Sequence, residues 1–275
     1  MSQKITIAAE TQTNSIECLN IADKKVGLFV TCLVNTMRPS VGFAAITLLE
    51  QAGCTVEVPE LQSCCGQPAF NSGDDEGTRQ IAYQTIKQFE HFDYVVLPSG
   101  SCAAMIKKNF IEIFKDDPKW LAKAKHLASI THELLSFLVD VCHFEPSGIE
   151  LDGSYTYHDS CSGYRALHVY EQPRKMLSKV KGLDHKPLNN HSECCGFGGT
   201  FCVKYSDISN EIVAEKVENI LATKADYLLG GDMGCLMNIA GKLNREGHKE
   251  ITALHTAEVL AGLAPQVLGG KDASE

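Results

Sequence analysis

The sequence lacks the features that would place the protein in a membrane, in an export pathway or on a nucleic acid. No apolar run among its 275 residues approaches the roughly 20 residues needed to span a bilayer. The first 25 residues show no basic start followed by an apolar core, so no secretory signal is predicted. Acidic residues outnumber basic ones by 34 to 25, whereas a nucleic-acid binder usually carries a basic face. We therefore expect a cytoplasmic protein with no membrane span and no nucleic-acid partner.

Motifs for nucleotide binding and for a disulfide scaffold are also missing. No Gly-x-Gly-x-x-Gly follows a predicted strand, and no Walker lysine is present. The 12 cysteines make up roughly 4% of the chain, well below a small disulfide-rich domain. In a reducing cytosol, clustered cysteines more often bind metals or carry redox chemistry than form structural bridges.

What the sequence does contain is a cysteine pattern that occurs twice. Cys64-Cys65-Gly66 and Cys194-Cys195-Gly196 each combine an adjacent pair with a glycine. A single cysteine precedes each pair, with 31 residues between them in the first copy and 32 in the second. Another follows each pair after 36 and 39 residues. The first quartet is thus Cys32, Cys64, Cys65 and Cys102, and the second quartet is Cys161, Cys194, Cys195 and Cys235.

The order of predicted strands and helices repeats with the same offset, roughly 130 residues, which indicates an internal duplication. Strands and helices alternate, a pattern typical of parallel βαβ units. We predict an α/β fold of two tandem, duplicated Rossmann-like open-sheet domains with cysteine-rich loops at the C-terminal strand ends. The predicted boundaries are an N-terminal extension over 1–24, a first domain over 25–147 and a second over 148–275.

The spacing of apolar residues also predicts individual helices and strands. In the first half the apolar spacing predicts a helix near 120–125 and a strand over 127–130. In the second half it predicts one continuous helix over 164–180. Each quartet residue falls at a strand end or in the loop that follows, where open α/β sheets bind their ligands.

Four thiolates per half match the usual ligand number of one iron–sulfur cluster. Gly196, Gly198 and Gly199 would let the backbone approach such a cofactor closely. Zinc also accepts four thiolates, but structural zinc sites usually draw on two short Cys-x-x-Cys pairs. We favour one or two 4Fe–4S clusters over zinc and over purely redox-active thiols.

At these residues the sequence resembles a known family. Each half is similar to a cysteine-rich CCG domain, the type found in heterodisulfide reductases and in the iron–sulfur subunit of glycolate oxidase. The best understood members end the pattern in Cys-x-x-Cys, and five cysteines hold a non-cubane 4Fe–4S cluster. Here Met105 and Asn238 stand in place of that final cysteine, which leaves four thiolates per site.

Three further stretches are similar to the two-domain CCG proteins of lactate utilisation: His158 to Cys161, the run over 194–200 and the run over 234–238. The resemblance implies an iron–sulfur subunit of a cytosolic, NAD-independent complex that oxidises L-lactate, a small 2-hydroxy acid, to pyruvate. It also implies two partners, a ferredoxin-like iron–sulfur subunit and a third small subunit. A heterodisulfide-reductase-like redox subunit and a zinc-stabilised structural subunit are the alternatives.

His158, Asp159 and Arg165 surround the second quartet in sequence and have no counterparts near Cys32. As catalytic residues, Arg165 would pair with a substrate carboxylate and His158 would take the hydroxyl proton. Alternatively, His158 and Asp159 hydrogen-bond the loops and tune the cluster, and we favour this second role. Four remaining cysteines are predicted to be free or packed thiols: Cys18, Cys54, Cys142 and Cys202.

Overall fold

The computed structural model describes residues 21–263, which form two four-stranded parallel sheets. The first sheet has the order β2-β1-β3-β4 and the second the order β6-β5-β7-β8, so the two topologies are equivalent. The predicted tandem α/β fold is confirmed. Residues 1–20 of the predicted extension lie outside the described residues, and Ile21–Asp23 form one 3-10 turn, η1. The strands are β1 (Lys25–Leu28), β2 (Thr55–Glu57), β3 (Tyr94–Leu97), β4 (Thr131–Glu133), β5 (Glu150–His158), β6 (Lys181–His185), β7 (Tyr227–Gly230) and β8 (Thr252–His255).

Helices connect the strands and cover both sheets. Those of the first half are α1 (Cys32–Met37), α2 (Pro39–Gln51), α3 (Gln67–Phe70), α4 (Asp75–Phe89), α5 (Gly100–Ala104), the π-helical η2 (Met105–Asn109), α6 (Phe110–Ile113), α7 (Pro118–Ile130), α8 (Leu134–Ser136) and the π-helical η3 (Phe137–Val141). Those of the second half are α9 (Cys161–Leu167), α10 (Glu171–Leu177), α11 (Phe201–Lys204), α12 (Ser206–Ala222), α13 (Met233–Glu246) and α14 (Thr256–Leu260). Between residues 21 and 263, no helix combines the length and apolarity that a bilayer crossing requires.

Two predicted elements are wrong in detail. The strand predicted over 127–130 is the last turn of α7, and the fourth strand begins only at Thr131. Leu127 and Ala128 continue a buried helical stripe with Ala124, because the short apolar run has helical rather than strand periodicity. The helix predicted over 164–180 is two helices, because Pro173 cannot donate a backbone hydrogen bond within a continuous helix.

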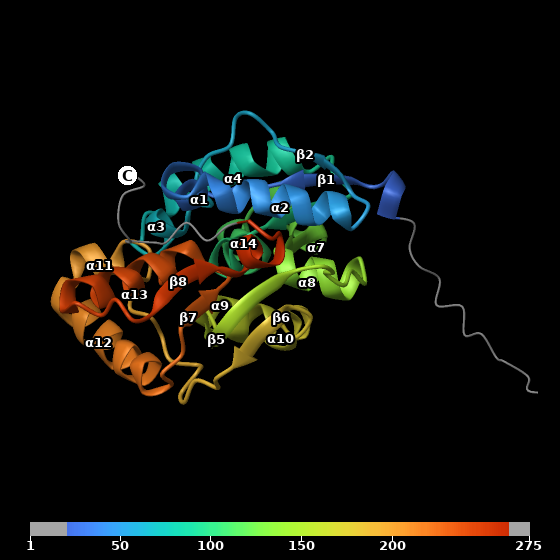
Figure 1. Cartoon of the computed structure of the whole chain (residues 1–275). Helices are drawn as coiled ribbons and strands as arrows, with labels where there is room; N and C mark the ends of the chain where they lie inside the picture. Colours follow the sequence, from blue (N-terminus) through green and yellow to red (C-terminus); the bar gives the residue numbers. More distant parts are fainter. Residues whose placement is uncertain (1–20, 264–275) are drawn as a thin grey trace, which may run out of the picture.

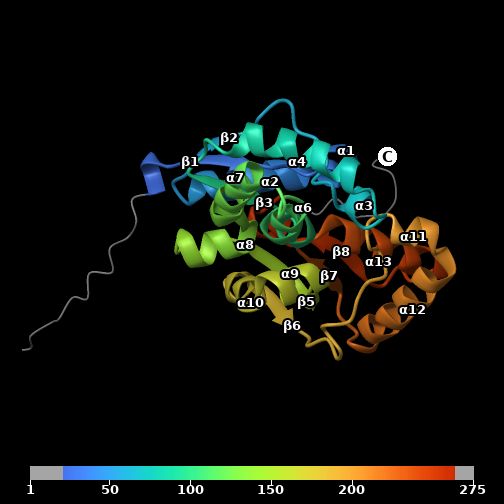
Figure 2. The same ribbon diagram turned by 180° about the vertical axis from the view of Figure 1, so that it is seen from behind.

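The two halves lie against each other (Figures 1 and 2), with the blue-to-green half beside the yellow-to-red half. One apolar core joins them, because Val26 and Leu28 of the first sheet belong to the same buried cluster as Tyr157 and Leu254 of the second. A buried ion pair also crosses between the halves: Arg38 Nε lies 2.8 Å from Glu258 Oε1. The C-terminal ends of the strands in both halves therefore belong to one packed body.

Candidate metal centres

The first quartet gathers at the C-terminal edge of the first sheet. Cys32 opens α1 directly after β1, and Cys102 lies in α5 directly after β3. Cys64 and Cys65 precede α3, and the Sγ atoms of Cys32 and Cys64 are 3.7 Å apart. Cys65 is buried, and the neighbouring thiols of Cys102 and Cys64 raise its pKa, so the four sulfurs form one group.

The second quartet repeats this arrangement in the second sheet. Cys161 opens α9 after β5, and Cys235 lies in the first turn of α13 after β7. The thiols of Cys161 and Cys195 lower the pKa of Cys194, and those of Cys194 and Cys235 raise the pKa of Cys195, so these four sulfurs are close neighbours. The structure thus brings together both sets of four cysteines that the sequence pattern singled out.

The electrostatics of the two quartets are also alike. Hydrogen bonds from neighbouring thiols lower the pKa of Cys64 to about 3 and that of Cys194 to about 2. The same hydrogen bonds, together with burial, raise the pKa of Cys32 and Cys161. One thiolate per quartet is therefore favoured without metal, and a cation is needed before all four sulfurs can ionise at such close range.

The repeated glycine after each cysteine pair shapes the loop. Gly66 has φ +88° and Gly196 has φ +79°, a left-handed conformation that disfavours side chains. A Cβ on Gly196 would lie 2.8 Å from the carbonyl oxygen of Ser209. In this conformation the Gly196 N–H donates to Cys194 Sγ at 3.3 Å. Gly196 therefore approaches the quartet by its backbone, as the sequence predicts for a cofactor loop.

A cavity of about 190 Å³ adjoins the first quartet and is lined by both halves. All four cysteines of that quartet line it, together with Phe197, Gly199 and Met233 of the second half. Gly198 accepts a hydrogen bond from Asn71 Nδ2 at 3.2 Å. The predicted cofactor-binding glycines 198 and 199 therefore lie against the first half, across from their own quartet.

These residues fit an iron–sulfur cluster, as judged from the donors and the space. Each site offers four converging thiols, and the first has an adjoining cavity. Met105 and Asn238, which stand in place of a fifth cysteine, make hydrogen bonds within the protein. Met105 Sδ accepts from Asn109 Nδ2 at 3.3 Å, and Asn238 Nδ2 donates to the Cys195 carbonyl at 2.8 Å. Neither side chain replaces a thiolate, so each half offers four thiol donors.

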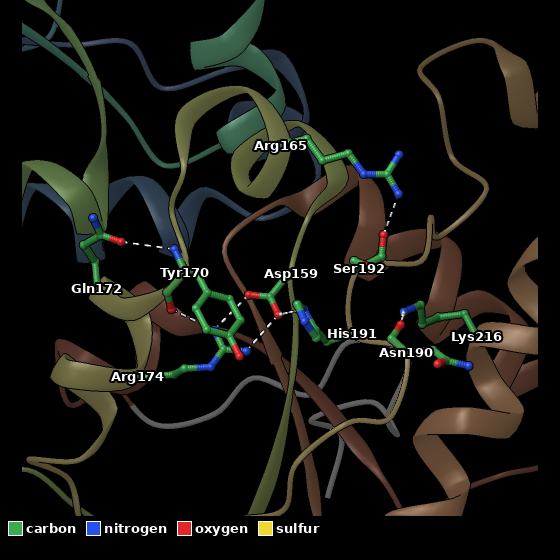
Figure 3. A network of polar contacts seen from close by, with 9 residues as sticks. All are labelled: Asp159, Arg165, Tyr170, Gln172, Arg174, Asn190, His191, Ser192 and Lys216. Carbon is green, nitrogen blue, oxygen red and sulfur yellow. Dashed lines mark hydrogen bonds and ion pairs between the residues drawn. The ribbon is translucent and has the colours of Figure 1, made fainter.

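A polar network braces the loop that carries Cys194 and Cys195 (Figure 3). Asp159 is buried and accepts two hydrogen bonds from Arg174, at 2.9 and 2.8 Å. The same carboxylate contacts His191 Nδ1 at 3.1 Å. Arg165 donates to the Ser192 carbonyl at 2.8 Å, and Lys216 donates to the Asn190 carbonyl at 3.2 Å. Three charged side chains thus hold the segment over 190–192.

The three residues considered as catalytic face different partners. Asp159 faces Arg174 and His191, and Arg165 is exposed and faces Ser192. His158 is buried beside the thiols: one of its ring nitrogens and the sulfurs of Cys195 and Cys235 lie within 4.8 Å of one another. The structure does not bring the three side chains together around one ligand.

Sequence reasoning missed Lys216 and Arg174, and it missed the contacts of Asp232 with the other half. Lys216 is fully buried on α12, in the stripe formed by Val213, Val217 and Ile220, and a lysine at such a position is the signal that could have found it. Asp232 accepts from the Ser99 hydroxyl at 3.1 Å and the Ser101 N–H at 2.9 Å in the other half. No local pattern predicts a contact across 131 residues.

The remaining cysteines lie outside the quartets. Cys54 Sγ and Cys142 Sγ are 4.0 Å apart, and Cys202 Sγ donates to the Gly199 carbonyl at 3.6 Å. All three are free thiols. Cys18 lies outside the described residues.

Comparison with known proteins matches each half of the chain separately to one family. The profile of the family described as CCG, cysteine-rich domain, matches residues 26–107 and 155–240. The chain belongs to this family. It is 51% identical over 236 residues to lactate utilization protein A of Geobacillus sp. (strain WCH70), covering 86% of this chain and 98% of that protein. Lactate utilization protein A of Anoxybacillus flavithermus is 50% identical over 235 residues, with the same coverage of both chains.

A solved structure supports the fold alone. A hypothetical protein from Helicobacter pylori superposes with a TM-score of 0.63 at 9% identity, over 89% of this chain and half of that chain. The likeness confirms the α/β architecture of the CCG chain. Its identity is too low to carry a function.

Proposed function

We propose that this CCG protein is an iron–sulfur oxidoreductase subunit of a cytosolic complex that oxidises L-lactate to pyruvate. The observation that carries the proposal is the pair of converging thiol quartets in a chain half-identical to lactate utilization protein A. That relative's name supports a role in lactate utilisation. The metal-binding geometry supports the chemical part that the chain plays in it.

The reaction requires an acceptor for electrons. Oxidation of L-lactate to pyruvate releases two protons and two electrons. An iron–sulfur cluster, when bound, supplies a one-electron acceptor held by cysteine thiolates. The described residues include no nicotinamide-type loop, and the sequence has no Gly-x-Gly-x-x-Gly after a strand. Electron transfer through thiolate-held iron is therefore the chemistry for which the chain is equipped.

The protein's own residues hold and shield the two centres. The eight quartet cysteines are the ligands, with one 4Fe–4S cluster per quartet. Gly196 donates its N–H to Cys194, and such hydrogen bonds to sulfur raise the reduction potential of a cluster. Asp159, Arg165 and Lys216 fix the loop that presents Cys194 and Cys195. We assign Asp159 and Arg165 to positioning, because their hydrogen bonds and ion pairs are to the protein.

The lactate site is proposed to involve partners. A ferredoxin-like iron–sulfur subunit and a third small subunit would complete the complex and pass the electrons on. One observation favours zinc as a second candidate: His158, Cys195 and Cys235 provide three donor atoms close enough for a single metal ion. In that case the chain would be a zinc-stabilised structural subunit.

The test is co-expression of the chain with its two proposed partners and anaerobic purification. We expect brown protein that reduces a dye with L-lactate as the donor, and loses this activity when any one partner is omitted. Colourless, zinc-containing protein would overturn the proposal in favour of the structural subunit. Brown protein that oxidises dithiols to disulfides but not lactate would favour a heterodisulfide-reductase-like role.

A further inference from the structure

His158 is the most unusual polar residue beside the second quartet. Its side chain is only 1% exposed, and neither ring nitrogen has a hydrogen-bond partner. A buried polar group without a partner costs free energy, and nearly all such groups in proteins are satisfied. Its environment is polar enough to offer partners, since Lys216 and Cys194 both lie near it. The orphaned imidazole therefore points to a bound group that completes it.

The position of the ring shows where that group would lie. His158 is the last residue of β5, three residues before Cys161. One of its nitrogens and the Sγ atoms of Cys195 and Cys235 are within 4.8 Å of one another, a spacing that ligands of one metal ion adopt. The nearby Lys216 ammonium is directed to the Asn190 carbonyl at 3.2 Å. The imidazole thus faces the thiols.

The duplicated half provides an internal control. The residue three positions before Cys32 is Phe29, which is equally buried, at 1% exposure. Its ring packs on Phe89 with centroids 5.3 Å apart and belongs to an apolar cluster. The scaffold therefore accepts an apolar aromatic ring at this place. The imidazole of the second half is not required by packing, which favours a role at the metal.

We propose that His158 is a direct ligand of the second metal centre, which is thereby held by cysteine and histidine together, whereas the first centre is held by cysteine alone. This inference rests on the proposed function for the identity of the metal. A neutral imidazole added to the four thiolates contributes no negative charge, whereas a fifth thiolate would, and histidine ligation raises the reduction potential of such centres. We therefore expect the second centre to have the higher potential.

The experiment isolates the second centre in the full chain. Cys65→Ser, which removes a ligand from the first quartet, provides a background in which the spectra report the second. The protein is labelled with ¹⁵N-histidine, purified anaerobically and reduced, and pulsed EPR measures the hyperfine coupling of nitrogen to the cluster. Three further variants are compared in this background: His158→Phe, which copies the first half, His158→Cys, and His91→Gln, which removes an exposed imidazole.

We expect a strong histidine ¹⁵N coupling in the Cys65→Ser and His91→Gln proteins and none in His158→Phe. His158→Cys should retain iron and shift the midpoint potential to a more negative value. If the second centre contains iron but shows no strong histidine coupling, the inference fails and the proposed function stands. If the protein contains zinc instead, the proposed function fails, and X-ray absorption at the zinc edge decides on His158: a histidine nitrogen in the shell supports the ligand, and a sulfur-only shell overturns it.

Discussion

The two halves of the chain share strand order and thiol quartet but differ in what surrounds the sulfurs. At matched positions the first half has Phe29 and Val30 where the second has His158 and Asp159. Thr78 on α4 and Ser209 on α12 are buried at matched places behind the cysteine loops. Seven residues further along each helix, the first half has Thr85 and the second has Lys216. The second centre thus has a buried imidazole and a buried cation, and the matched positions of the first half hold an apolar ring and a neutral hydroxyl.

This difference suggests a division of roles after duplication. Both halves keep four cysteines, so in the proposed function each half holds a metal centre. A positive charge and a neutral ligand make a reduced cluster less costly, so the second centre should accept electrons more readily than the first. The buried Arg38–Glu258 pair and the Asp232 contacts hold the two unequal centres in one rigid body.

The largest expected effect comes from Cys195→Ser. With one cluster per quartet, iron should fall from about eight to about four atoms per chain, and lactate-dependent dye reduction should be lost. Cys65→Ser should remove the other half of the iron. The matched control is Cys202→Ser, seven residues further along, which should keep all the iron. Iron analysis and EPR check this, and full activity in Cys195→Ser would refute its assignment as a ligand.

The repeated glycines should respond unequally to a methyl group. Gly196→Ala places a Cβ 2.8 Å from the Ser209 carbonyl oxygen, and the nearest atom to a Cβ in Gly66→Ala is Ile81 Cγ2 at 3.4 Å. We expect Gly196→Ala to lower the free energy of unfolding by about 4 kcal/mol, through strain and overpacking. Gly66→Ala should lower the free energy of unfolding by only about 1–2 kcal/mol, the strain of a left-handed alanine. Urea unfolding measures both, and equal losses would contradict the geometry.

Glu133 ends β4 and His255 ends β8. These two residues should make the free energy of unfolding depend on pH in opposite directions. Burial raises the pKa of Glu133 to about 7 and lowers that of His255 to about 4. Glu133 therefore contributes stability that is complete below its ordinary pKa of 4.5 and is lost as pH rises through 7. His255 contributes stability that is complete above 6.5 and is lost as pH falls through 4.

Each of these contributions is on the order of 3 kcal/mol. Relative to the parent protein, Glu133→Gln should flatten the decline between pH 4.5 and 7, and His255→Gln the decline between 6.5 and 4. Urea midpoints across pH 4–8 test the pair. Unchanged profiles in both variants would show that these groups titrate normally.

The smallest effect is expected from the buried cation. Lys216→Met removes the positive charge behind the second quartet and should shift the potential of that centre to a more negative value. Thr85→Val, its counterpart in the first half, should leave both potentials unchanged. An EPR-monitored redox titration measures each centre separately. A shift in the first centre alone would contradict the placement of Lys216.

The sequence predicted the duplicated fold and the membership of each quartet because both depend on spacing along the chain. Alternating strands and helices place every strand end on one edge, so cysteines at those ends must converge. The break before α10 could have been predicted, because Pro173 lacks a backbone N–H, whereas the strand at Thr131–Glu133 could not, because its residues are polar.

The surroundings of the centres were less predictable. His158 could be noticed from its place beside Cys161, but its unpartnered state depends on packing by α12, some fifty residues away. The contacts of Asp232 and Arg38 join the two halves, and no local pattern contains such contacts. Local sequence patterns do not predict how one half packs on the other.

The most direct test of the account is anaerobic metal analysis of the parent protein combined with EPR of the reduced sample. The account predicts about eight iron atoms per chain and two distinct paramagnetic centres with different midpoint potentials. Iron-free protein with stoichiometric zinc, or a single centre that survives Cys195→Ser, would contradict it.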